Sequence, residues 1–286
     1  MSYLEGLFGL QGQLALVTGG TRGIGQSMAL ALARAGADIL LVQRDTTNKK
    51  THNQIISLGR KCTIYTADLA LQESVAGIVP RILADGHKIT ILLNCAGIQR
   101  RHPSDKFPSK DWDEVLQVNL TTVFTMCRDV GAHMLSNEPD SAGRRGSIIN
   151  IASLLSFQGG LTVPAYAASK GGIAQLTKAL SNEWISKGIA VNAIAPGYID
   201  TEMNNALIDD ENRAANILAR IPAGRWGKPD DFEGAAVFLA GRASAYKKPK
   251  EKTQLIINSL WATPIVSTAT IFTSGARASF FGDSHL

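Results

Sequence analysis

Short apolar runs alternate with longer amphipathic runs along most of this chain. The apolar runs have the length of buried strands, and the amphipathic runs have the period of helices. We expect strands at about residues 14–18, 38–43, 62–67, 89–94, 146–152 and 189–195, and helices at about residues 24–35, 47–58, 72–84, 111–135 and 165–185. Strands separated by helices indicate right-handed βαβ crossovers and a parallel sheet covered on both faces. The pattern therefore predicts an α/β fold: a single domain with a doubly wound, Rossmann-like parallel sheet.

This pattern stops near Tyr246. A charge run follows at residues 247–252, and residues 254–274 hold no charged side chain. Pro264 and many hydroxyl groups argue against a membrane span in this segment. We therefore expect one folded domain over residues 8–246 and an atypical tail over residues 247–286, which is either disordered or an artefact of the gene model.

Composition narrows the classes of function. The chain has 286 residues and is 45% hydrophobic, which is ordinary for a globular protein with a large core. Its net charge of +5 suits an anionic ligand, and no basic stripe predicts nucleic-acid binding. The N-terminus lacks the pattern of a signal peptide, so we expect a cytoplasmic protein. Cys62, Cys95 and Cys127 show neither CxxC nor His/Cys ligand spacing, which predicts reduced thiols and no metal site.

Distinctive residues follow all six predicted strands. They are Thr18–Gly25, Gln43 with Arg44, Asp68, Asn94–Gly97, Ser153, and Pro196 with Gly197. Each group alone is compatible with simple turn chemistry. Ligands of a doubly wound sheet bind beyond the carboxyl ends of its strands. Six such groups in register therefore predict one ligand that lies along this edge of the sheet.

Tyr166 and Lys170 are four residues apart and project from one face of the helix predicted there. A cation beside a phenol favours the phenolate, so we expect the pKa of Tyr166 to fall below its ordinary value of about 10. Such a tyrosine can exchange a proton with a substrate oxygen, and Ser153 can hydrogen-bond the same oxygen. An isolated YxxxK is more often an ordinary surface pair, but here the strand-end residues favour a catalytic role.

Together these residues resemble the short-chain dehydrogenase/reductase family. Its TGxxxGxG pattern matches Thr18, Gly19, Gly23 and Gly25, its NNAG matches Asn94–Gly97 with one substitution, and its YxxxK matches Tyr166 and Lys170. The resemblance covers about residues 8–246 and identifies them as a dinucleotide-binding catalytic domain. It implies a nicotinamide cofactor, NAD or NADP, and reversible oxidation of a secondary alcohol to a ketone. It also implies a homo-oligomer, a tetramer by resemblance.

The resemblance assigns roles residue by residue. The implied catalytic residues are Asn119, Ser153, Tyr166 and Lys170. The implied cofactor-binding residues are Gly19, Arg22, Gly23, Ile24, Gly25, Arg44, Asp68, Asn94, Ala96, Gly97, Tyr166, Lys170, Pro196, Gly197 and Thr201. Glycines at a helix N-terminus let the backbone approach a pyrophosphate, where free N–H groups favour anions.

Three implied roles have structural alternatives. Asp68 binds the adenine amine or caps the next helix. Asn119 supports a proton relay through water or bends its helix. Arg22 contacts a 2′-phosphate or is a solvated loop residue. Because Gln43 and Arg44 stand where an acidic residue would bind a free ribose 2′-hydroxyl, the sequence favours NADP.

A closer resemblance, to 2-deoxy-D-gluconate 3-dehydrogenases and related sugar-acid dehydrogenases, rests on residues 151–160, 193–198 and 221–229. It points to Arg100 and Arg101, with Ser153, as substrate residues, because arginine can hold a carboxylate in a bidentate pair. The alternative is that both arginines are solvated or bind a neighbouring subunit. Residues 202–220 are expected to form a lid over the pocket.

The tail departs from the family, whose members add a seventh strand and a VDGG turn. Either residues 254–258 replace that strand, or the sixth strand keeps an open edge that invites aggregation. Two further functions stay open. One is reduction of a 3-oxoacyl group or another ketone, and the other is dinucleotide binding without turnover because of the aberrant C-terminus.

Overall fold

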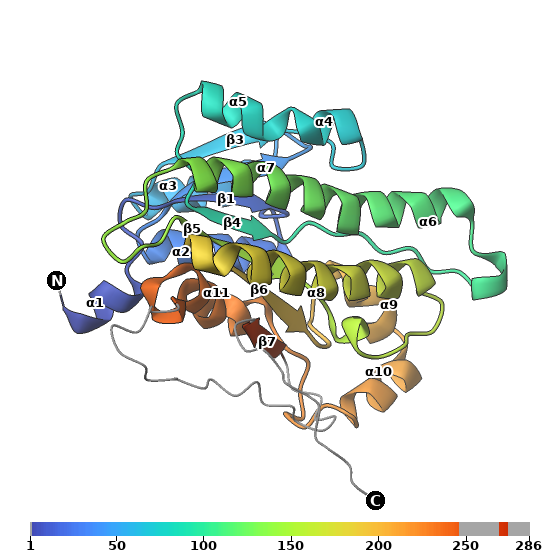
Figure 1. The fold of residues 1–286 in the computed structure, drawn as a ribbon. Coiled ribbons are helices and arrows are strands. Elements are labelled where there is room, and N and C mark those ends of the chain that lie inside the picture. The colour runs from blue at the N-terminus through green and yellow to red at the C-terminus, as the bar shows by residue number, and fades with distance from the viewer. Residues whose placement is uncertain (1, 246–268, 274–286) are drawn as a thin grey trace, which may run out of the picture.

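The computed structural model describes residues 2–245 and 269–273, which form a central sheet between two layers of helices (Figure 1). The strands are β1 (Leu14–Thr18), β2 (Asp38–Gln43), β3 (Cys62–Thr66), β4 (Ile91–Asn94), β5 (Gly146–Ile151), β6 (Ile189–Pro196) and β7 (Ala269–Thr273). The helices are α1 (Tyr3–Phe8), α2 (Gly23–Arg34), α3 (Lys50–Ser57), α4 (Gln72–Ala76), α5 (Ile78–Ala84), α6 (Ser109–Leu116), α7 (Thr122–Ser136), α8 (Pro164–Trp184), α9 (Asn205–Ile208), α10 (Glu211–Leu218) and α11 (Glu233–Ala240). The predicted doubly wound α/β fold is confirmed.

The strands are ordered β3-β2-β1-β4-β5-β6-β7, and β1 to β6 are parallel. The order reverses between β1 and β4, which is the position where such sheets bind ligands. The register sets Thr18 beside Asn94, and Asn94 beside Asn150. The carboxyl ends of these central strands are therefore level and form one edge.

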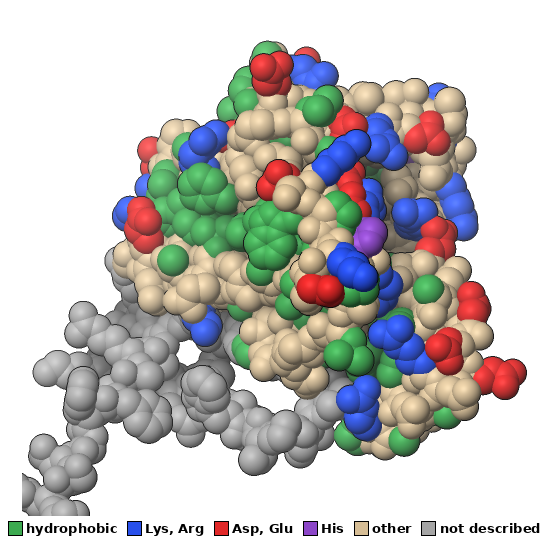
Figure 2. All heavy atoms as spheres, turned by 90° about the vertical axis from the view of Figure 1, so that its right-hand side faces the viewer, with side chains coloured by type: hydrophobic (Ala, Val, Ile, Leu, Met, Phe, Trp, Pro, Cys, Tyr) green, Lys and Arg blue, Asp and Glu red, His purple; other side chains and the backbone are tan. Residues whose placement is uncertain are grey.

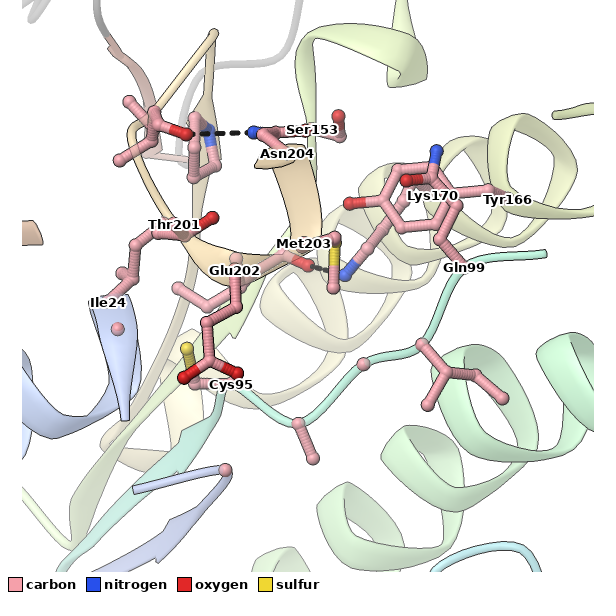
Figure 3. Close-up of a pocket in the computed structure, with 18 of the residues that line it drawn as sticks. Ile24, Cys95, Gln99, Ser153, Tyr166, Lys170, Thr201, Glu202, Met203 and Asn204 are labelled. Carbon is pink, nitrogen blue, oxygen red and sulfur yellow. Dashed lines mark hydrogen bonds between the residues drawn. The ribbon is translucent and has the colours of Figure 1, made fainter. Parts of the chain in front are cut away.

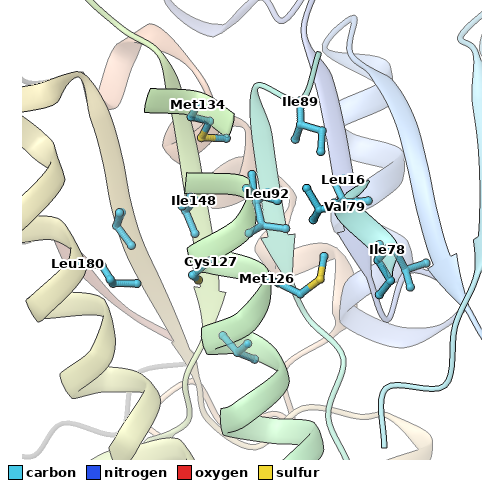
Figure 4. Packing of buried hydrophobic residues seen from close by; sticks show 14 of the residues in the cluster. Leu16, Ile78, Val79, Ile89, Leu92, Met126, Cys127, Met134, Ile148 and Leu180 are labelled. Carbon is cyan, nitrogen blue, oxygen red and sulfur yellow. The ribbon is translucent and has the colours of Figure 1, made fainter. Parts of the chain in front are cut away.

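Alternate strand residues pack against opposite helix layers, as the two-residue period of a strand requires. Leu16 packs on one face with Ile78 of α5 and Met126 of α7 (Figure 4). Its neighbours Ala15 and Val17 pack on the other face, in the cluster that includes α2 and α11. All five side chains are buried, which explains why the strands are apolar runs without alternation.

Two predicted helices are interrupted. The helix expected over residues 72–84 is divided at Gly77 into α4 and α5. The helix expected over residues 111–135 is divided by a π turn, η2 (Gln117–Thr121), in which the Thr122 N–H donates to the Gln117 carbonyl. Such turns are frequent at functional sites.

Helices α7 and α8 pack closely against each other where Gly131 of α7 meets Trp184 of α8. A Cβ atom at Gly131 would lie 2.5 Å from the ring of Trp184. Glycine is therefore required at this position by the packing of the two helices.

β7 covers the outer edge of β6. It runs antiparallel to β6, with Ala269 beside Pro196 and Thr273 beside Asn192. This pairing corrects the expectation of an open sixth strand, because tail residues 269–273 supply the backbone hydrogen bonds. The other proposed replacement, residues 254–258, lies outside the described residues.

No helix in the described part of the chain combines the length and apolar character needed to cross a membrane.

Candidate active site

A cavity of about 1160 Å³ opens at the carboxyl edge of the sheet. Figure 2 faces this side of the molecule, where Lys and Arg side chains gather around a hollow. The predicted site residues that line the cavity are Gly19, Arg22, Gly23, Ile24, Gly25, Arg44, Asp68, Ala96, Gly97, Arg100, Arg101, Ser153, Tyr166, Lys170, Pro196, Gly197 and Thr201. Of the predicted site residues, Asn94 and Asn119 lie outside this lining.

The glycine loop between β1 and α2 needs its glycines for two different reasons. Gly19 has φ +70°, and a Cβ atom there would lie 2.6 Å from the Ala96 backbone nitrogen. At Gly25 a Cβ atom would lie 2.2 Å from the Gly19 carbonyl oxygen. The Ala96 N–H donates to the Thr18 hydroxyl over 3.3 Å, which holds the loop against the turn after β4.

This loop delivers the N-terminus of α2 to the cavity. α2 has 12 residues, and no side chain of its N-cap residue, Arg22, bonds the first N–H groups. Uncapped N–H groups and the helix dipole favour an anion at this place. A pyrophosphate fits here because the glycine loop brings these free N–H groups to the cavity.

Asn94 is buried under the edge rather than exposed to the cavity. Its amide nitrogen donates to the Asn150 side-chain oxygen over 3.0 Å and to the Cys127 sulfur over 3.3 Å. Asn150 in turn donates to the Thr177 hydroxyl over 3.0 Å. The side chain of Asn94 therefore ties β4 to β5, and it does not line the cavity in which the cofactor is expected.

Tyr166, Lys170 and Ser153 come together in the cavity from α8 and the end of β5 (Figure 3). The Lys170 ammonium lies 5.7 Å from the centre of the Tyr166 ring and donates to the Ile151 carbonyl over 2.6 Å. Ser153 hydrogen-bonds the Tyr166 side chain, and its hydroxyl accepts from the Leu155 N–H over 3.1 Å. The predicted catalytic trio is thus assembled in one place.

The expectation of a lowered tyrosine pKa is wrong for the ligand-free protein. Burial raises the pKa of Tyr166 to about 12, and the hydrogen bond with Ser153 and the charge of Arg101 only partly oppose this effect. Burial also lowers the pKa of Lys170 to about 8. Desolvation disfavours both charged forms and is the largest cause of each shift.

Asn119 lies in the π turn and is fully buried. Its side-chain oxygen accepts from the Ile98 N–H over 2.8 Å, and its nitrogen donates to the Ile98 carbonyl over 2.9 Å. The same nitrogen donates to the Ser169 hydroxyl over 3.2 Å. The amide therefore fixes the loop after β4 to the helix that carries Tyr166.

Two pocket arginines near the glycine loop already have acidic partners. Arg22 forms an ion pair with Glu202 over 2.5 Å, and Arg44 lies 3.9 Å from Asp68. One oxygen of Asp68 accepts from the Ala70 N–H over 2.9 Å in the loop before α4. The N-cap of α4 is Leu71, so Asp68 lines the cavity and does not cap this helix. These exposed pairs are weak and can exchange a carboxylate for a phosphate at small cost.

The two predicted substrate arginines differ. Arg100 forms an ion pair with Glu114 over 2.7 Å. The side chain of Arg101 donates to the Gln99 side-chain oxygen over 3.0 Å and forms no ion pair among residues 2–245. Because Arg101 keeps its charge uncompensated inside the cavity, the geometry favours Arg101 over Arg100 as an anion ligand.

The sequence analysis gave no role to several polar and aromatic cavity residues, among them Tyr198, Glu202 and Arg213. The last two belong to the segment expected as a lid. Tyr198 packs edge-on against Trp226, with ring centres 5.7 Å apart, beside a small cluster of Leu207, Ile217 and Ile221. No pattern in the sequence distinguishes these residues from other polar or aromatic loop residues.

Comparison with known proteins agrees with this geometry. The family model described as short chain dehydrogenase matches residues 13–212. A 2-dehydro-3-deoxy-D-gluconate 5-dehydrogenase of Pseudoalteromonas atlantica is 48% identical over 84% of this chain and 92% of its own, and the Bacillus subtilis protein of that name is 48% identical over 86% and 94%.

Solved structures give the same result. A gluconate 5-dehydrogenase of Burkholderia cenocepacia, in complex with NADP and tartrate, superposes with a TM-score of 0.79 at 39% identity, over 85% of this chain and 93% of that one. A Beutenbergia cavernae protein with bound NADP, proposed to be an NAD(P)-dependent gluconate 5-dehydrogenase, superposes with a TM-score of 0.79 at 44% identity, over 84% and 94%. The chain belongs to the short-chain dehydrogenase family, whose members are NAD(P)-dependent oxidoreductases acting on CH–OH groups.

Proposed function

We propose that this protein interconverts a secondary alcohol and a ketone of a sugar acid, in the substrate class of 2-dehydro-3-deoxy-D-gluconate and gluconate. The observation that carries the proposal is the unpaired Arg101 in the same cavity as Ser153, Tyr166 and Lys170. One cavity thus contains both the residues that can transfer a proton and an arginine that can bind a carboxylate. The names of the similar proteins support the same substrate class.

The chain's own residues divide the reaction between them. In the oxidative direction Tyr166 takes the hydroxyl proton of the substrate, and Ser153 hydrogen-bonds the same oxygen. A bound nicotinamide supplies the hydride acceptor in this direction and the donor in reverse. Lys170 holds a positive charge near the phenol, which stabilises the phenolate once the site is closed. Asn119 positions the loop after β4 and helix α8.

We propose NADP as the preferred cofactor. Arg22 and Arg44 line the cavity beside the glycine loop, and the carboxylate of Asp45 is engaged by the Thr47 N–H and hydroxyl over 2.8 and 2.7 Å. Thr47 thus engages one oxygen of Asp45, and a 2′-phosphate can bind the two arginines. Replacing Arg44 with Ala should raise the Michaelis constant for NADP at least about tenfold while leaving that for NAD unchanged. Equal effects on both cofactors would contradict the assignment.

The direct test is a dehydrogenase assay of the purified full chain with both cofactors. D-gluconate and 2-dehydro-3-deoxy-D-gluconate are compared with D-glucitol and a 3-oxoacyl thioester, with Ser153→Ala and Tyr166→Phe as inactive controls. We expect turnover of a sugar acid that falls at least about 100-fold in Tyr166→Phe, with NADPH binding retained. Turnover of only the thioester would favour the ketone-reductase alternative. NADPH binding without any turnover would favour a non-catalytic dinucleotide-binding protein.

We further propose a homo-oligomer in the cytoplasm. Trp112 on α6 and Phe124 on α7 are 36% and 44% exposed, and a contact with a second subunit would bury them. The three free cysteines suit a reducing compartment. Sedimentation velocity of the wild type and of Phe124→Asp tests the assembly, and a monomeric wild type would contradict it.

A further inference from the structure

Two arginines approach the cavity from opposite structural elements. Arg101 belongs to the loop after β4, and Arg213 belongs to α10 in the lid segment. Arg213 and Ile217 are four residues apart on α10 and both line the cavity, so they share the face of the helix that is turned inward. The lid therefore presents a cation to the same space as Tyr166.

Arg101 and Arg213 differ from the other cavity arginines in charge pairing and burial taken together, since Arg220 also forms no ion pair among the described residues but is exposed. Arg22, Arg44 and Arg100 each have a carboxylate partner. Among the described residues, neither Arg101 nor Arg213 forms an ion pair, and both are half-buried. Burial lowers the pKa of Arg101, and the positive charge of Arg213 lowers it further, so the two charges lie close enough to act on each other.

Two half-buried cations that line one cavity repel each other, and an anion bound between them reverses the sign of the interaction. The planar guanidinium groups match a carboxylate better than a hydroxyl group. Because Tyr166 lies near Arg101, an anion held there sits at a defined place relative to the reacting oxygen. The cavity thus fits a small acid whose carboxylate and alcohol lie at different positions of one chain.

We propose that Arg213 is the second arm of a carboxylate clamp with Arg101, and that it gives the site its specificity for sugar acids over neutral polyols. This inference rests on the proposed function, because it names the group of the sugar acid that the lid recognises. Leu207, Ile217 and Ile221 hold α9 and α10 together as one unit, so the clamp also couples the position of the lid to the substrate carboxylate.

The test compares Arg101→Gln and Arg213→Gln with Arg220→Gln. Arg220 also lines the cavity from the lid but is exposed and forms no ion pair within the described part of the chain, so it controls for loss of one lid charge. Tartrate is titrated into each NADP-loaded protein, and the affinity is measured by calorimetry. We expect tartrate to bind about tenfold to a hundredfold more weakly to Arg101→Gln and Arg213→Gln, with wild-type affinity in Arg220→Gln.

Steady-state kinetics give the second readout. The Michaelis constant for D-gluconate should rise by a similar factor in Arg213→Gln, while kinetics with D-glucitol stay unchanged. Arg213→Lys should recover part of the loss because it restores the charge without the fork geometry. NADPH fluorescence and circular dichroism establish that each variant is folded.

Equal tartrate affinity in Arg213→Gln and wild type, or equal losses in Arg213→Gln and Arg220→Gln, would overturn the clamp. A wild type that turns over no sugar acid would refute the proposed function instead. Tartrate binding still decides the clamp in that case, so the two failures are distinguishable.

Discussion

Lys170 should reduce the stability of the folded protein at neutral pH. It is 4% exposed, and its pKa falls from 10.5 to about 8 on burial. At about 1.4 kcal/mol per pKa unit, this drop corresponds to about 3 kcal/mol of desolvation that the charged side chain costs. Lys170→Met removes this cost but leaves the Ile151 carbonyl without its donor, which costs about 1–2 kcal/mol. We therefore expect the variant to gain about 1–2 kcal/mol in unfolding free energy at pH 7, and to lose dehydrogenase activity.

The pH dependence is the sharper measurement. Because the folded pKa is below the unfolded pKa, the unfolded state binds more protons between them, and wild-type stability rises with pH through this window. The difference between Lys170→Met and wild type should therefore shrink by about 1 kcal/mol from pH 7 to pH 9. Effects of other titrating groups cancel in this difference. Urea unfolding followed by circular dichroism measures it, with Lys178→Met on the exposed face of α8 as the control.

A difference that stays constant with pH would refute the reasoning, whatever its size. It would mean that Lys170 is not a desolvated cation in the free protein. A pH-dependent difference of the same size in Lys178→Met would refute it equally.

Three further changes test the fold and the cofactor cradle. Gly19→Ala should weaken NADPH binding at least about tenfold in a fluorescence titration, because the new Cβ meets the Ala96 backbone nitrogen at 2.6 Å. Gly12 also has a positive φ, +75°, but a Cβ there meets no atom within 4 Å. Gly12→Ala therefore controls for backbone strain and should bind NADPH normally. Gly131→Ala should lower the unfolding free energy by about 1–3 kcal/mol, because the added methyl group overpacks the contact with Trp184. Gly171→Ala in α8, where no atom lies within 4 Å of the new Cβ, should raise the unfolding free energy by up to about 1 kcal/mol. Equal effects of the two changes would contradict the packing argument. Truncation after Ala245 removes β7 and should lower the urea midpoint and increase light scattering, whereas an unchanged midpoint would show that the pairing with β6 contributes nothing.

The strands of the sheet could be predicted because each is marked by a short apolar run in its own segment of the sequence. Strands buried on both faces read as apolar runs, and their carboxyl ends must meet at one edge. Thr18, Asn94 and Ser153 were placed at that edge from the chain alone, and the register aligns the first two side by side. Gly19 and Gly25 were recognised as necessary by their positions, and the contacts at 2.6 and 2.2 Å give the physical reason.

The features that could not be predicted depend on contacts between residues that are far apart in the sequence. The pKa of Tyr166 is governed by burial, which the spacing to Lys170 does not reveal. The ion pair of Arg100 with Glu114 and the lack of one at Arg101 depend on how a loop crosses α6. Arg213 lies in a polar helix whose sequence looks like any solvated surface. The pairing of β7 joins segments far apart in the chain, where local patterns carry no information.

The buried thiol of Cys127, which contacts Asn94 and Asn150, can report how often α7 separates from the sheet. Cys127 is fully buried between α7 and the sheet, and burial raises the pKa of its thiol to about 12. Alkylating reagents attack the thiolate, so at pH 8 this sulfur is protected in the closed protein by both shielding and protonation. The rate at which a reagent labels Cys127 therefore measures how often α7 separates from β4 and β5. Mass spectrometry of the labelled peptide reads that frequency without any engineered probe.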